Sequence, residues 1–328
     1  MTKITDNGCR LCPRNCGVLR SDGRYGYCGS DDVTAASRAA LHMWEEPCIS
    51  GSRGSGAVFF TGCNLHCCFC QNHVISGGGT GKKISTERLS EIFLELQDKK
   101  ANNINLVTPT HYSDKIAEAV VKAKKNGLSI PVVYNCGGYE SVDTVTMLGD
   151  CVDVWMPDMK YMSSELAARY SNAPDYFERA SAALAVMAAQ VEKKGGLNFV
   201  DEDKMPNVSA SDTVGINADT GEKFSIMTRG VLVRHMTLPG AVADSKRILR
   251  YLHNTYGNSI YISIMSQYTP MPHILNGDGY PELKRPVSAG EYDRLVSFAE
   301  KIGIENAFVQ GGEVAKESFI PEFDGLGI

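Results

Sequence analysis

The sequence has no long apolar run, no excess of positive charge and no block of like charges. The N-terminal stretch, MTKITDNGCRLC, lacks the apolar core of a signal peptide, and no segment approaches the length of a membrane-spanning helix. We therefore expect a cytoplasmic protein that has no membrane partner. The net charge of −5 argues against a nucleic-acid partner, because nucleic-acid-binding surfaces are usually basic.

Charged residues are also few, at 22% against 43% hydrophobic residues, so the chain can bury a large core and disorder is not expected. Its 328 residues suit either one barrel-sized domain with a small attachment or two domains. We place a division near residue 50. Residues 1–50 would form a metal-binding module with its linker, and residues 51–328 the larger domain.

Cysteine, in contrast, is abundant, with eleven residues. A reducing cytoplasm disfavours disulfides, so these cysteines are expected to be free or bound to metal. Eight of the eleven fall in two tight groups, which favours metal centres over scattered core thiols.

The second of these groups lies in Gly62–Asn72, GCNLHCCFCQN, directly after the apolar run Ala57–Thr61. Cys63, Cys67 and Cys70 have the spacing C-x3-C-x2-C. Three thiolates on one short loop can bind three irons of a [4Fe–4S] cluster and leave the fourth iron open for a substrate.

Two other interpretations of this loop stay open from the residues alone. The three cysteines with His66 or His73 could form a tetrahedral zinc site. They could also be inert core thiols, since free cysteine is often buried. The position of the loop after a predicted strand favours the cluster.

The first cysteine group, CRLCPRNCGVLRSDGRYGYC, has the spacing C-x2-C-x3-C-x11-C. A segment this short cannot form its own hydrophobic core, so four soft ligands indicate a structural or auxiliary metal site. Zinc and iron–sulfur clusters both accept four cysteines, although the Cys-Pro pair and the short gaps favour a cluster. The four candidate ligands are Cys9, Cys12, Cys16 and Cys28.

Short apolar runs then alternate with helical periodicity, which predicts parallel strands joined by helices. We expect an α/β fold, a partial (β/α)6 barrel of parallel strands preceded by the small four-cysteine module. Leu41–Gly56 is predicted as a linker and residues 195–223 as an inserted surface loop or small hairpin. The six predicted strands are Ala57–Thr61, Ile104–Val107, Ile130–Tyr134, Val152–Met156, Val231–Met236 and Ser259–Met265.

The cysteine loop and several later segments, among them LVTPTHY, MPDMKY, RHMTLPG and SQYTP, resemble the radical S-adenosylmethionine (SAM) superfamily and its pyruvate formate-lyase activating enzyme-like members. The resemblance implies an iron–sulfur enzyme that binds SAM at the open iron of a [4Fe–4S] cluster. One electron, from a donor such as flavodoxin or ferredoxin, would cleave SAM to a 5′-deoxyadenosyl radical. That radical would abstract hydrogen from a protein substrate such as a glycyl radical enzyme.

Two features depart from the activases that this chain resembles. Thr108-Pro109-Thr110 stands where they carry Gly-Gly-Glu, and Asn135 where they carry an acidic residue, whereas Asp158-Met159-Lys160 keeps their Asp-x-Lys motif. Radical modification of a peptide or small metabolite is therefore an alternative function. A non-catalytic iron–sulfur electron carrier or metal-binding protein is another, but it would need no SAM pocket.

Polar residues at predicted strand ends supply candidates for SAM binding, because working residues of a parallel barrel gather at those ends. Lys160 or Arg234 could pair with the SAM carboxylate. Asp158 could hold a hydroxyl, a cation or Lys160, and ordinary structural ion pairs remain the alternative for each. The full set of candidates is Thr108, Thr110, Asn135, Asp158, Lys160, Arg234 and His235.

Overall fold

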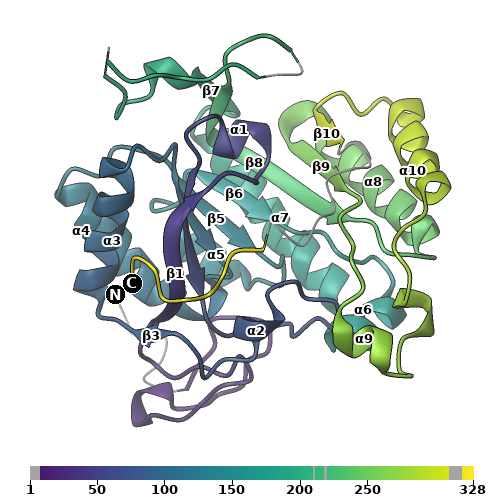
Figure 1. The fold of residues 1–328 in the computed structure, drawn as a ribbon. Helices are drawn as coiled ribbons and strands as arrows, with labels where there is room; N and C mark the ends of the chain where they lie inside the picture. Colours follow the sequence, from purple (N-terminus) through teal and green to yellow (C-terminus); the bar gives the residue numbers. More distant parts are fainter. Residues whose placement is uncertain (1–7, 210, 218–219, 310–319) are drawn as a thin grey trace.

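An open, mostly parallel sheet is the frame of the molecule (Figure 1). The computed structural model describes residues 8–209, 211–217, 220–309 and 320–328. Within them, seven neighbouring strands run parallel, and the sheet does not close. The parallel strands are β2 (Ser55–Phe60), β4 (Ile104–Val107), β5 (Val132–Cys136), β6 (Val154–Pro157), β8 (Ser225–Met236), β9 (Tyr261–Met265) and β10 (Ala307–Val309).

The predicted α/β partial barrel is therefore confirmed, and each of the six predicted strands is present. Three strands of this sheet were not predicted at their positions. β10 extends the parallel sheet at one edge, and β1 (Ala35–His42) pairs antiparallel with β2 at the other. The short β3 (Lys82–Lys83) pairs antiparallel with β1.

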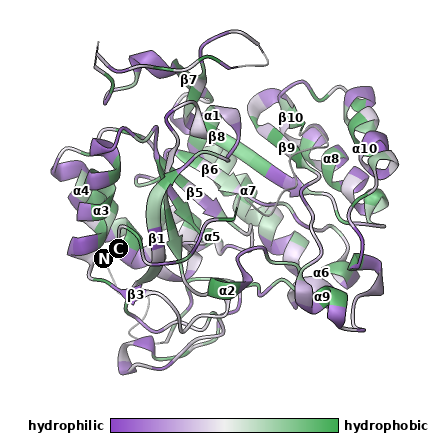
Figure 2. Cartoon of the chain, in the orientation of Figure 1, coloured by the Kyte–Doolittle hydropathy of each residue, from purple (hydrophilic) through white to green (hydrophobic). Residues whose placement is uncertain are grey.

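Helices cover the outer face of this sheet, and their buried residues share its main hydrophobic core. Figure 2 shows largely hydrophobic strands in the middle of the molecule, with helices of mixed hydropathy around them. No helix of the described chain is long and apolar enough to cross a membrane. The longer helices are α3 (Thr86–Asp98), α4 (Ser113–Lys125), α5 (Val142–Leu148), α6 (Ser164–Ser171), α7 (Tyr176–Lys193), α8 (Val242–Tyr256) and α10 (Ala289–Ile302).

Local signals explain where several helices begin. The Ser288 hydroxyl accepts from the Glu291 backbone while the Glu291 carboxylate accepts from Ser288, which is the capping box that the sequence predicts. Ser85 caps α3 in a similar way by accepting from the Arg88 backbone. The shorter elements are α1 (Pro47–Ser50), α2 (His73–Ser76), α9 (Pro272–Asn276), η1 (Arg20–Asp22), η2 (Thr110–Tyr112), η3 (Glu202–Lys204), η4 (Gly257–Ser259) and η5 (Pro281–Leu283).

The sheet has an outer face toward the helices and an inner face, and successive residues of a strand alternate between them. In β8, Val231 and Val233 pack in the main core with the helices, whereas Leu232 packs in a separate inner cluster. By the same alternation Arg234 faces inward and His235 faces outward. This alternation determines which of the predicted site residues can lie on the same face of the sheet.

The segment Leu41–Gly56 is not a simple linker, and this prediction was wrong. It begins at the end of β1 and includes α1, whose Cys48 and Ile49 are buried in the inner cluster with Val154 and Leu232. The carbonyl of Ile49 accepts from the Asn103 side chain at 2.7 Å. The segment therefore fills the interior of the open barrel.

The predicted insertion at residues 195–223 contains a hairpin: β7 (Asn198–Asp201) pairs antiparallel with the start of β8. Not every acidic residue of this segment lies on the surface, however. Glu202 is fully buried, and its carboxylate accepts from the Ser52 hydroxyl at 2.7 Å and from Asn102 Nδ2 at 2.5 Å. Buried charge needs such partners, so Glu202 anchors this segment to the barrel.

Candidate functional site

The three cysteines of the loop after β2 line a cavity of about 190 Å³. The chain leaves β2 at Gly62, whose φ of +89° few other residues adopt. A Cβ at Gly62 would lie 2.5 Å from the Cys28 carbonyl oxygen, which accepts a hydrogen bond from the Cys63 backbone at 3.2 Å. The loop thus rests directly on the N-terminal segment. The three cysteines that line the cavity are Cys63, Cys67 and Cys70.

These sulfur atoms have the surroundings of metal ligands. The Leu65 backbone donates to Cys63 Sγ at 3.4 Å, and the Ser171 hydroxyl donates to Cys67 Sγ at 3.0 Å. Burial, together with the nearby Cys67, raises the pKa of the Cys63 thiol to about 11 and that of the Cys70 thiol to about 12. Thiols that influence one another in this way lie close together, and a metal would stabilise all three as thiolates.

The lining of the cavity also carries charge, at the ends of β6 and β8. Lys160 Nζ lies 2.5 Å from Asp158 Oδ2, and Arg234 Nε lies 3.2 Å from Asp158 Oδ1. Burial opposes the charge on Lys160, but Asp158 and the cysteine sulfurs outweigh it, so the pKa of Lys160 is raised. Burial likewise opposes the charge on Asp158, yet Lys160 and Arg234 hold its pKa below the usual value. All three groups are ionised at neutral pH.

Arg234 is held by three acceptors. Besides Asp158, its Nη1 lies 3.1 Å from Glu45 Oε2, and its Nη2 donates to Asn135 Oδ1 at 2.6 Å. All three guanidinium nitrogens are therefore engaged, and Arg234 fixes the positions of its neighbours. Lys160 has one described ion-pair partner and retains N–H donors toward the cavity. Lys160 is thus the better placed cation for a carboxylate ligand.

With this geometry established, comparison with known proteins is informative. Residues 57–200 match the model of the Radical SAM superfamily. Over this segment the chain is therefore similar to radical SAM domains. The matched segment runs from β2 through the cysteine loop and the Asp158–Lys160 motif to β7.

Among curated proteins, the uncharacterized protein MJ0674 of Methanocaldococcus jannaschii is 25% identical over 307 residues, which are 90% of this chain and 75% of the relative. Among solved structures, Streptococcus suis SuiB bound to S-adenosylmethionine matches with a TM-score of 0.47 and 10% identity, over 76% of this chain and 48% of SuiB. Methylornithine synthase (PylB) matches with a TM-score of 0.43 and 14% identity, over 75% of this chain and 68% of that protein. The chain spans about half the length of the SuiB chain.

A radical SAM domain implies a [4Fe–4S] cluster and SAM, and the residues present fit both. Three neighbouring thiols, two of which accept hydrogen bonds, suit an iron–sulfur cluster, whose properties depend on such bonds. The cavity lining also offers a cation, an amide and a carboxylate for the polar groups of SAM. Of the predicted SAM contacts, Thr108, Asn135, Asp158, Lys160 and Arg234 line the cavity.

Thr110 and His235 do not line the cavity. The Thr110 hydroxyl is buried and donates to Glu140 Oε1 at 2.7 Å. His235 faces the helices, where its Nδ1 lies 2.7 Å from the Met159 carbonyl oxygen, and burial lowers its pKa. Both residues support the strand ends from outside the cavity.

Glu140 gives the domain a pH-dependent stability. Burial raises its pKa from 4.5 to about 7, although the Thr110 and Tyr134 hydroxyls oppose the shift. The folded state therefore binds a proton that the unfolded state releases, and stability falls as the pH rises between these two values. Glu140→Gln should be more stable than the wild type near pH 8 by roughly 3 kcal/mol and no more stable near pH 5. Urea unfolding at both pH values measures this difference, and parallel pH dependence of the two proteins would contradict it.

Several cavity residues were missed from the sequence. Glu45 holds Arg234, and Met236, Met265 and Gln267 line the cavity at the ends of β8 and β9. Gln267 had a signal, because it follows a predicted strand. Nothing in the sequence around Glu45 distinguishes it from an ordinary surface carboxylate.

The four N-terminal cysteines also converge. A Cβ at Gly26 would lie 3.5 Å from the sulfurs of both Cys16 and Cys28, so glycine leaves room between them. The buried Arg20 lies beside two of the thiols: its Nη1 is 3.8 Å from Cys9 Sγ, and Cys28 and Cys9 oppose the effect of burial and raise its pKa. A buried cation beside thiols suits anionic ligands. Among the described residues, no three His, Cys, Asp or Glu side chains are close enough to hold a single metal ion, and this holds for both cysteine groups. The ligands of an iron–sulfur cluster bind separate irons and do not need to converge on one ion.

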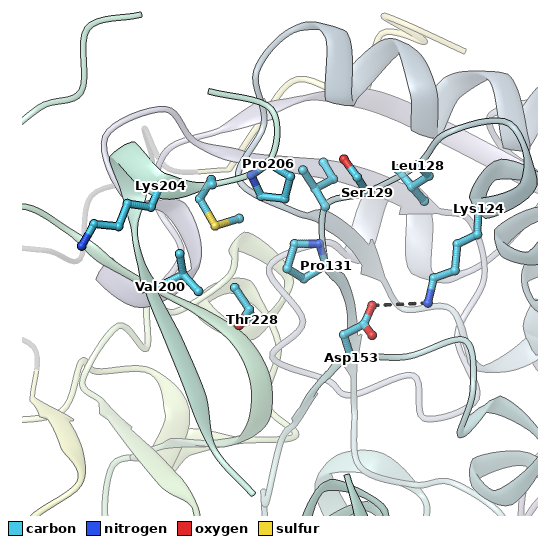
Figure 3. Close-up of a pocket in the computed structure, with 11 residues that line it drawn as sticks. Lys124, Leu128, Ser129, Pro131, Asp153, Val200, Lys204, Pro206 and Thr228 are labelled. Carbon is cyan, nitrogen blue, oxygen red and sulfur yellow. Dashed lines mark ion pairs between the residues drawn. The ribbon is translucent and has the colours of Figure 1, made fainter. Parts of the chain in front are cut away.

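A larger hollow of about 410 Å³ lies at the opposite end of the strands (Figure 3). Pro131 precedes β5 there and Asp153 precedes β6, so the hollow faces the amino ends of the parallel strands. Its charges are mutually compensated, since Lys124 Nζ lies 3.5 Å from Asp153 Oδ2. It contains none of the predicted site residues, and active sites of parallel barrels lie at the other end.

Proposed function

We propose that this chain is a radical SAM enzyme that reductively cleaves SAM and uses the resulting radical to abstract a hydrogen atom from its substrate. The observation that carries the proposal is the single cavity lined both by three neighbouring thiols and by Lys160, which Asp158 holds. When bound, the cluster and SAM supply an organic radical that a side chain cannot provide. The similarity to radical SAM domains implies an enzyme, which disfavours the electron-carrier alternative.

The chain's own residues hold and orient the reacting groups. Cys63, Cys67 and Cys70 would bind three irons, and Lys160 would pair with the SAM carboxylate. Tyr176 fixes Lys160 in place, because its hydroxyl accepts from the Lys160 backbone at 3.0 Å and donates to the Asp158 carbonyl at 2.8 Å. Preorganised charges of this kind need no rearrangement when the ligand binds.

The reaction requires one electron, which a flavodoxin or ferredoxin partner would supply. The first candidate substrate is a glycyl radical enzyme, activated as by the activases that the sequence resembles. The second is a peptide or small metabolite. The second is favoured by the buried polar residues on the inner face of the sheet, which could bind a small polar group.

Anaerobic reconstitution with iron and sulfide, followed by dithionite and SAM, tests the proposal. The product to measure is 5′-deoxyadenosine, with Cys63→Ala as the negative control and Cys68→Ala as the matched control. Failure of fully iron-loaded wild-type protein to form it would contradict the proposal. A glycyl radical signal on a co-purified protein would identify an activase, and its absence alongside a modified metabolite would identify the second substrate class.

We also propose that Cys9, Cys12, Cys16 and Cys28 bind a second metal centre, either an iron–sulfur cluster or zinc. Cys12→Ala should lose this metal and loosen the segment up to about Gly29 while the barrel remains folded, because metal binding supplies the folding energy of so small a unit. Metal analysis with Mössbauer spectroscopy checks the metal, and limited proteolysis checks the segment. One four-iron centre and no zinc in anaerobically purified wild-type protein would contradict the second site.

The structure adds a consequence to this prediction. Arg14 of the same segment donates to the Asn64 carbonyl at 2.8 Å and to the Ser171 carbonyl at 3.1 Å. Ser171 in turn donates to Cys67 Sγ. Loss of the N-terminal metal should therefore also change the electron paramagnetic resonance spectrum of the cluster at the loop.

A further inference from the structure

Three buried polar side chains lie on the inner face of the sheet, one level below the cavity. Asn105 in β4 is two residues before Val107, and Ser263 in β9 is two residues before Met265, and both of these later residues line the cavity. Because alternate residues share a face, Asn105 and Ser263 point to the same interior. Glu46, from the segment that fills the barrel, is the third.

By distance and angle, each of the three has a polar atom that no described residue pairs: Glu46 Oε2, Asn105 Oδ1 and Ser263 Oγ. The Ser263 hydroxyl nevertheless lies close enough to Glu46 to lower its pKa, so the atoms that need an outside partner most clearly are those of Glu46 and Asn105. Asn105 and Ser263 are fully buried, and Glu46 is 6% exposed. Buried polar atoms are nearly always paired in folded proteins, so three on one face indicate a ligand that would pair them.

The three side chains also lie close to one another. Asn105 Nδ2 donates to Glu45 Oε1 at 3.0 Å, which places the amide beside the residue that precedes Glu46. Burial raises the pKa of Glu46, and Ser263 and Arg234 are among the groups that lower it, so both lie near its carboxyl group.

The cations of this interior are already paired. Glu45 and Asp158 share Arg234, and Asp158 also pairs with Lys160, so both cations already have partners. Glu46 has no cation within ion-pair distance in the described part of the chain. The nearby His42 does not supply one, because burial lowers its pKa to about 4 and leaves it neutral.

We propose that Glu46, Asn105 and Ser263 bind a protonated amino group of the substrate. An ammonium has three N–H donors and no acceptor, and the site offers a carboxylate, an amide carbonyl and a hydroxyl oxygen. The bound group would lie on the inner face of the sheet, one level below the cavity-lining residues Val107 and Met265. This inference rests on the proposed function and assigns its substrate to the class of primary amines, such as a lysine-containing peptide or an amine metabolite.

Calorimetric titration of n-butylammonium chloride into cluster-loaded, SAM-bound protein under anaerobic conditions tests the inference, with n-butanol as the uncharged probe. Butylammonium should bind the wild type at least tenfold more tightly than butanol does. Glu46→Gln should lose at least tenfold in butylammonium affinity, and Ser263→Ala should lose about three- to tenfold. The matched control is Glu300→Gln, which removes the same charge from the exposed face of α10 and should bind as the wild type does.

Three outcomes would overturn the inference: equal binding of amine and alcohol, unchanged amine affinity in both Glu46→Gln and Ser263→Ala, or an equal loss of SAM affinity in Glu46→Gln. The last would assign the site to the amino group of SAM itself. Glu46→Gln should not melt below the wild type, because it removes a carboxyl group whose charged form is disfavoured by burial. Amine binding needs no SAM cleavage, so a protein that binds the amine but forms no 5′-deoxyadenosine contradicts only the proposed function.

Discussion

Replacing Cys63, Cys67 or Cys70 by alanine is expected to remove the [4Fe–4S] cluster of the cavity and all SAM cleavage, whereas Cys68→Ala keeps both. Each of the three thiols would bind a different iron, so losing one removes a corner of the cluster. Cys68 has the same chemistry in the same loop but a different position. Its backbone donates to the Tyr170 carbonyl at 2.8 Å, and its side chain does not line the cavity.

Iron content alone would not decide this prediction if the N-terminal cysteines hold a second cluster. The sharper measurement is the electron paramagnetic resonance spectrum of the reduced protein with and without SAM, because only a cluster with an open iron changes when SAM binds. The SAM-induced change should be absent from the three loop variants and present in Cys68→Ala and Cys12→Ala. Equal loss in Cys68→Ala and Cys67→Ala would show that the assigned ligands are wrong.

The parts of this protein that the sequence predicted well are those set by local chemistry. The spacing of the three cysteines is contained within eight positions of one loop, from Cys63 to Cys70. Runs such as Ile104–Val107 and Tyr261–Met265 are strands because branched apolar residues suit a buried parallel sheet. The capping box at Ser288 is likewise complete within four residues.

The features that were missed depend on contacts between distant segments. β1 has the sequence AASRAALH, whose alanines carry no preference for a strand, and it exists because it pairs with β2. The burial of α1 depends on the side chains of Asn102 and Asn103. Glu45 reaches Arg234 across 189 positions of sequence, a distance over which no spacing rule applies.

One mistaken expectation could have been avoided. Arg234 and His235 are consecutive in a strand, so they must face opposite sides of the sheet, and only one can enter the cavity. The alternation of Val231, Leu232 and Val233 could not decide which, because all three are apolar. The structure decides which residue faces the cavity, because Val231 and Val233 are buried in the main core whereas Leu232 is buried in the inner cluster.

Lys160 and Arg234 are expected to respond differently to removal, although both lie in the cavity wall. Lys160→Ala leaves Asp158 paired with Arg234, so the fold should persist while SAM loses the cation for its carboxylate. A charge-assisted hydrogen bond of this kind contributes about 1.5–3 kcal/mol, or roughly ten- to hundredfold in affinity. Arg234→Ala instead leaves Glu45 and Asp158 without their shared partner, and breaking a buried ion pair costs about 3–5 kcal/mol of stability.

Anaerobic calorimetric titration of SAM, paired with a melting curve for each variant, separates these effects. Lys160→Ala should melt near the wild type and bind SAM weakly, and Arg234→Ala should melt at a much lower temperature. Lys125→Ala, on the exposed face of α4, controls for the loss of one positive charge and should change neither quantity. If Lys160→Ala binds SAM as the wild type does, Lys160 only braces the strand ends, and the carboxylate of SAM must be held by another group of the cavity. If Arg234→Ala keeps its stability, the two carboxylates find another partner, and the tight arrangement around Arg234 does not hold the site together.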